Sequence, residues 1–142
     1  MIEGLEHIAL SVSNLETSLA FYRDVLGMTL MRTIEPGSGG DLGNVVGLPG
    51  ARARIAHLES GGVMLELFEY LAPRGEAIAE ERTQADTGFT HIGFTSTDVR
   101  GDYQRFKAKG VAFIGEPSEF RPGVWIVYFR GPDGEVCELR QS

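Results

Sequence analysis

The chain has 142 residues, which is enough for one domain with a sizeable core. Its net charge of -7 argues against a nucleic-acid partner and against binding to an anionic membrane surface. A single cysteine excludes an intrachain disulfide, and the absence of a signal-peptide pattern or a long apolar run predicts a cytoplasmic protein.

The first half of the chain predicts one strand, one helix and three further strands. Apolar and polar residues alternate over residues 5–12, as in a half-buried strand. Ser13 and Glu16 then have the spacing of a capping box, which predicts the start of a helix. Apolar residues follow at helical spacing, and Gly27 is predicted to end this helix. The remaining elements are a strand at 28–34, a Gly- and Pro-rich loop at 35–50, and a hairpin of strands 52–59 and 63–70.

The second half repeats this order of elements. A strand is predicted at 89–97, a helix from the cap Asp98 to Gly110, a short strand at 111–115 and a hairpin of 124–129 and 135–141. The modules at about 3–70 and 88–141 are joined by a linker, 71–87, for which a short helix is predicted. The fold class is therefore α+β, with two βαβββ modules in a single domain, 1–142.

Each module opens with a histidine on an apolar strand and closes with a glutamate on another. These residues are His7 and Glu66 in the first copy, and His91 and Glu138 in the second. Side-chain alternation places the apolar neighbours of each residue against the helix, so all four should lie on the opposite, concave face. The pairs are 59 and 47 positions apart, and the 12 extra residues fit the long loop of the first module.

Imidazole and carboxylate groups are suitable ligands for Zn, Ni, Co, Mn or Fe(II). A lone histidine or glutamate on a strand is more often an ordinary polar residue. Four such residues at matched positions favour metal binding, because burying two carboxylates together without a cation costs several kcal/mol.

The segments 7–15, 21–27 and 131–139 resemble the signature segments of the vicinal oxygen chelate superfamily. This superfamily groups glyoxalase I, bleomycin-resistance proteins, extradiol dioxygenases and methylmalonyl-CoA epimerase. The resemblance implies that the modules pair into a barrel-like curved sheet with the helices outside, commonly within a homodimer.

The metal set His7, Glu66, His91 and Glu138 looks most like that of bacterial glyoxalase I. Four protein ligands leave two adjacent positions of an octahedron for the two oxygens of a chelating substrate. The resemblance implies one divalent metal per site and a lyase or isomerase that works through an enediolate of an α-oxygenated carbonyl compound. Glu138 is then the expected catalytic base, with Glu66 as the symmetric alternative. No further cofactor is expected.

Two other functions compete with this interpretation. An extradiol-type dioxygenase uses two histidines and one glutamate, and a bleomycin-resistance-like protein binds a drug without catalysis. The sequence has no convincing glutathione-binding set, with Arg32 and Arg121 as the only candidates. His57 is assigned a structural or surface role. The loops 36–50 and 116–123 are the expected mobile edges of the cleft.

Overall fold

The computed structural model describes residues 1–38 and 40–142, and it divides into two compact units, Met1–Ala77 and Ile78–Ser142. Gly39, which belongs to the predicted loop 35–50, lies outside the described residues. In the described part of the chain, no helix has the length and apolar character needed to cross a membrane.

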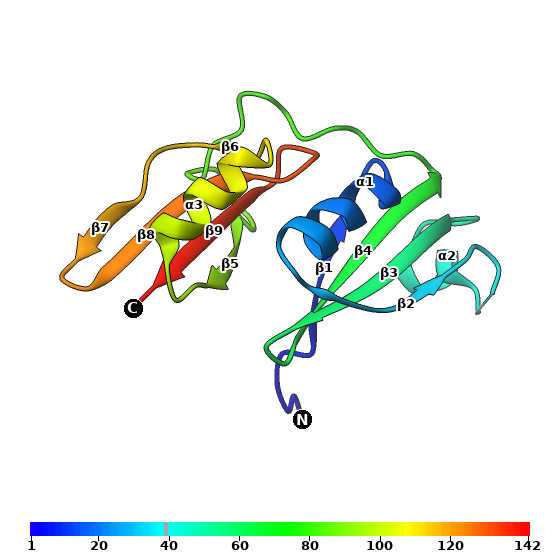
Figure 1. Ribbon diagram of the computed structural model, residues 1–142. Helices are drawn as coiled ribbons and strands as arrows, with labels where there is room; N and C mark the ends of the chain where they lie inside the picture. Colours follow the sequence, from blue (N-terminus) through cyan, green and yellow to red (C-terminus); the bar gives the residue numbers. More distant parts are fainter. Residues whose placement is uncertain (39) are drawn as a thin grey trace. The chain divides into compact units, whose positions relative to one another are not determined.

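The first unit is a four-stranded sheet with a helical segment on one face (Figure 1). The strand order is β1-β4-β3-β2, in which β1 is parallel to β4 and the other pairs are antiparallel. The elements in chain order are β1 His7–Ser11, α1 Leu15–Leu19, η1 Ala20–Val25, β2 Thr29–Ile34, α2 Leu42–Val46, β3 Arg52–Ser60 and β4 Val63–Ala72.

The second unit repeats this topology with one additional strand. Its order is β5-β9-β8-β6, with β7 also paired to β8, and helix α3 packs on β8 and β9 (Figure 1). The elements are β5 His91–Thr95, α3 Val99–Ala108, β6 Ala112–Phe113, β7 Ser118–Arg121, β8 Val124–Arg130 and β9 Val136–Gln141. The predicted α+β class with two βαβββ modules is confirmed, and each sheet taken by itself is open.

Strand alternation correctly predicted which side chains face the helices. In β4, Leu65 and Leu67 are buried, and they lie level with Ile8 and Leu10 of β1. In β9, Cys137 and Leu139 are buried in the same way. The glutamates between these apolar residues must therefore point to the opposite face of each sheet.

The first helix begins one residue later than predicted. Asn14, and not Ser13, is the N-cap, because its side-chain oxygen accepts a hydrogen bond from the Thr17 backbone N–H at 2.9 Å. The segment then continues as the π-helical turn η1, in which the Leu26 N–H donates to the Phe21 carbonyl at 3.0 Å. Gly27, with φ of 80°, ends it as predicted.

Two short elements were missed, and one predicted element is absent. Helix α2 lies in the predicted loop 35–50, and strand β7 lies in the predicted loop 116–123. The predicted linker helix is wrong: the described residues 73–90 contain none. There Asp86 accepts a hydrogen bond from the Thr83 N–H at 2.6 Å, which forms a local turn.

Phe129 anchors the core of the second unit. It is fully buried, with ring centroids 6.3 Å from Phe106 and 5.7 Å from Phe113. Phe129→Ala is expected to lower the free energy of unfolding by about 3–5 kcal/mol, measured by urea denaturation. Phe120→Ala on β7 is the matched control, since Phe120 is 76% exposed. Equal unfolding midpoints for the two variants would contradict this assignment of the core.

Candidate metal and catalytic site

Both histidine–glutamate pairs occupy the same register in their sheets. In the first unit, Ala9 of β1 lies opposite Glu66 of β4, two residues after His7. In the second, Gly93 of β5 lies opposite Glu138 of β9, two residues after His91. The sequence repeat is therefore also a repeat in strand pairing.

The imidazole and carboxylate of each pair are in direct contact. His7 Nε2 lies 3.0 Å from Glu66 Oε2, and His91 Nε2 lies 3.1 Å from Glu138 Oε2. The histidine side chains are 40% and 29% exposed, whereas the glutamates are 15% and 11% exposed. Each pair thus presents partly accessible nitrogen and oxygen donors on the face of the sheet away from the helix.

His57 is a third member of the first cluster, and it was not assigned to the site from the sequence. It lies opposite Glu66 in the β3–β4 hairpin, and its Nε2 is 2.7 Å from Glu66 Oε1. Its Nδ1 accepts a hydrogen bond from Arg32 Nε at 2.9 Å. Counting back from the predicted turn at 60–62 would have placed His57 beside Glu66, because a tight hairpin fixes cross-strand partners. Arg32, which was considered above as a glutathione anchor, instead donates this hydrogen bond to His57.

Tyr128 takes the place of His57 in the second unit. It lies opposite Glu138 in the β8–β9 hairpin, and its ring centroid is 4.9 Å from that of His91. Burial raises the pKa of the Tyr128 phenol, and its hydrogen bond with Glu138 raises the pKa further. The phenol therefore stays protonated at neutral pH and donates its hydrogen to the Glu138 carboxylate.

His7 has a second carboxylate neighbour, Glu6, which contacts its Nδ1. The hydrogen bond with Glu6 is the largest influence on the His7 imidazole and raises its pKa. The slight desolvation lowers the pKa, and the charge of Glu66 raises it again. The exposed edge strand β1 thus holds an imidazole between two carboxylates.

The donor types fit a divalent metal, and each unit supplies half of the predicted set. Imidazole nitrogen and carboxylate oxygen are ordinary ligands for Zn, Mn, Co, Ni or Fe(II). Among residues 1–38 and 40–142, no group of three or more His, Cys, Asp or Glu side chains could hold a metal ion by itself. The structure brings His7 to Glu66 and His91 to Glu138, and the meeting of both pairs at one metal remains a prediction.

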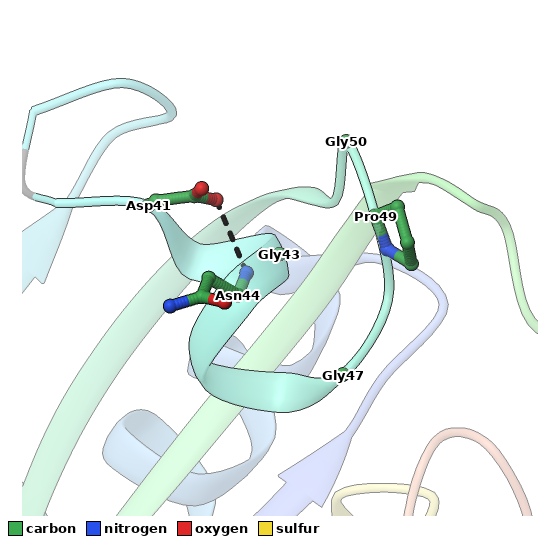
Figure 2. Close-up of a pocket in the computed structure, with 6 residues that line it drawn as sticks. All are labelled: Asp41, Gly43, Asn44, Gly47, Pro49 and Gly50. Carbon is green, nitrogen blue, oxygen red and sulfur yellow. Dashed lines mark hydrogen bonds between the residues drawn. The ribbon is translucent and has the colours of Figure 1, made fainter.

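A surface pocket of about 310 Å³ lies around helix α2, and none of these residues lines it (Figure 2). It is lined by Asp41, Gly43, Asn44, Gly47, Pro49 and Gly50. Its one carboxylate, Asp41, caps α2 by accepting a hydrogen bond from the Asn44 N–H at 3.1 Å (Figure 2). A Cβ on Gly43 would lie 2.6 Å from the Leu48 carbonyl oxygen, so the loop folds closely over the helix. We assign this pocket no chemistry.

Comparison with protein families identifies one match along almost the whole chain. Residues 4–139 match the family described as the Glyoxalase/Bleomycin resistance protein/Dioxygenase superfamily. The matched region includes both histidine–glutamate pairs.

Curated relatives carry several enzymatic activities. The chain is 32% identical to a 2-epi-5-epi-valiolone epimerase from Actinomyces sp., over 96% of this chain and 78% of the relative. It is 28% identical to a probable lactoylglutathione lyase from Synechocystis sp., over 97% and 95% of the two chains. A metallothiol transferase FosB from Staphylococcus haemolyticus is 30% identical, over 98% of this chain and 84% of the relative.

Solved structures of glyoxalase-type proteins share the fold. A glyoxalase family protein from Bacillus cereus aligns over 99% of this chain and 94% of its own, with 22% identity and a TM-score of 0.88. The fosfomycin resistance protein FosX from Listeria monocytogenes, crystallised with Mn(II) and sulfate, covers 100% and 94% of the two chains. Its identity is 23% and its TM-score is 0.67. These likenesses establish the architecture.

Proposed function

The chain belongs to the glyoxalase/bleomycin resistance protein/dioxygenase superfamily, and we propose that it is a divalent-metal-dependent lyase or isomerase. Its substrate is a small α-oxygenated carbonyl compound. The observation that carries the proposal is the repeated contact of an imidazole with a glutamate at one register position in both units. The relatives named epimerase and lactoylglutathione lyase support this class of reaction.

We propose that His7, Glu66, His91 and Glu138 together hold one metal ion. Each pair supplies one nitrogen and one oxygen donor, and among the described residues neither unit has a group of three or more His, Cys, Asp or Glu side chains that could hold a metal ion by itself. When bound, the metal supplies Lewis-acid polarisation of the substrate's carbonyl oxygen. Paired modules within a homodimer complete the proposal, as the family resemblance implies. A cytoplasmic location is proposed from the sequence, whose single cysteine fits a reducing compartment.

The protein's own groups then move the proton. Glu138 takes the proton from the carbon next to the carbonyl and returns it to a neighbouring carbon or to the opposite face. The Tyr128 hydroxyl donates a hydrogen bond to the Glu138 carboxylate and holds it in position. Glu66, which His7 and His57 contact as His91 and Tyr128 contact Glu138, is the symmetric alternative as base. The choice of Glu138 follows the resemblance to glyoxalase I.

Proton transfer at carbon is the property that separates this function from its competitors. In D2O, we expect the metal-loaded protein to exchange the α-hydrogen of an α-hydroxycarbonyl compound, of a hemithioacetal or of an acyl-CoA thioester, followed by NMR. Oxygen consumption on catechols without such exchange would favour a dioxygenase. Tight drug binding with neither activity would favour a non-catalytic binder.

A further inference from the structure

We propose that His57, oriented by Arg32, is a positioning residue that fixes the Glu66 carboxylate for metal binding. The inference rests on the proposed function, because it assigns His57 a task at the proposed metal site. His57 lies on β3, between Arg32 of β2 and Glu66 of β4 in consecutive cross-strand pairs. It is only 5% exposed, so neither of its ring nitrogens is available to a ligand from solution.

The direction of the hydrogen bonds follows from Arg32. A guanidinium group can only donate, so the 2.9 Å contact from Arg32 Nε makes His57 Nδ1 the acceptor. The ring hydrogen must then be on Nε2, which donates to Glu66 Oε1 at 2.7 Å. One carboxylate oxygen of Glu66 is thereby fixed, while the other, Oε2, faces His7 Nε2 at 3.0 Å.

This arrangement reduces the freedom that Glu66 would lose on binding a metal. Glutamate side chains have flexible torsions, and ordering one costs conformational entropy. Here the side chain is held from behind by a buried ring that is itself held by Arg32. Groups that orient metal ligands in this way typically account for about 10–100-fold in metal affinity.

The second unit offers an internal comparison. Tyr128 lies at the position of His57 and hydrogen bonds with Glu138, so both glutamates have a cross-strand donor. On the other side of β8, the apolar Ile114 donates its backbone N–H to the Tyr128 carbonyl at 2.9 Å, and so takes the place that Arg32 has beside His57. A phenol has only one hydrogen to donate, whereas an imidazole has two tautomers. An orienting arginine is therefore needed only in the first unit.

The direct test combines a spectrum of the metal-free protein with metal titration. In long-range ¹H–¹⁵N spectra of the metal-free wild type, His57 should carry its hydrogen on Nε2. His57→Leu should lower the affinity for Zn²⁺, added alone and measured by calorimetry, by about 10–100-fold. His57→Gln should recover most of it, because the carboxamide can donate to Glu66 and accept from Arg32.

Controls separate orientation from general stability. Arg32→Met should also weaken Zn²⁺ binding, whereas Arg23→Met should not, since Arg23 pairs only with Asp24 in the contacts described. If His57→Leu fails to fold, the Zn²⁺ affinities of His57→Gln and Arg32→Met still test the inference. Unchanged affinity in folded His57→Leu, or in folded Arg32→Met, would overturn the inference. If the wild type binds no Zn²⁺, the proposed function fails. The His57 tautomer still tests whether Arg32 orients the ring, because a hydrogen on Nδ1 would refute that part of the inference.

Discussion

Glu138→Gln is expected to lower the rate of α-hydrogen exchange by about 10²- to 10⁴-fold, the usual contribution of a positioned general base. The amide has the shape of the carboxylate and retains an oxygen that can accept the hydrogen bond of Tyr128. It cannot take a proton from carbon. We therefore expect a folded variant that keeps part of its metal affinity and loses turnover, measured by deuterium exchange in the metal-loaded protein.

Glu66→Gln is the matched control, because Glu66 occupies the equivalent register position in the first unit. It should weaken metal binding but retain more turnover at saturating metal than Glu138→Gln. Full activity of Glu138→Gln would refute its assignment as the base. A larger loss of turnover in Glu66→Gln would transfer that role to Glu66.

His7→Ala and His91→Ala are each expected to weaken metal binding by more than about 100-fold, the upper end for groups that only orient a ligand. The two histidines belong to different units, but in the proposed shared site each is a direct ligand, so either variant removes one metal ligand. The measurement is calorimetric titration with Zn²⁺ and with Mn²⁺.

Ser11→Ala and Thr95→Ala provide controls on the same two strands. Ser11 shares a strand face with His7, and Thr95 shares one with His91, and all four residues are exposed. These variants should bind metal as the wild type does. If His91→Ala retained wild-type affinity while His7→Ala did not, the first unit alone would hold the metal, and the four-ligand proposal would be wrong.

Strand alternation carried most of what could be predicted. A two-residue period assigns each side chain to a face without knowledge of the distant chain, and the burial of Leu67 and Leu139 bears this out. The same period placed Glu66 and Glu138 on the other face. The repeat then predicted the equivalence of the two modules, whereas the parallel pairing of β1 with β4 and of β5 with β9 came from the structure.

The misses have local and tertiary causes. Helix α2 depends on the Asp41 cap and on Gly47 at φ of 70°, which are also ordinary features of loops. Strand β7 exists because β8 offers it an edge, and that is a tertiary fact. His57 was overlooked because alternation alone gives the face of a residue, and the register that the predicted turn at 60–62 fixes was not used to find its neighbour across the hairpin.

Metal stoichiometry is the most direct test of a site shared by the two units. Protein purified without chelator and reloaded with Zn²⁺ or Mn²⁺ should contain one metal ion per chain by elemental analysis, whether one chain or two supply each site. Two metal ions per chain would mean that each histidine–glutamate pair binds independently. No retained metal would contradict the proposed metal site altogether.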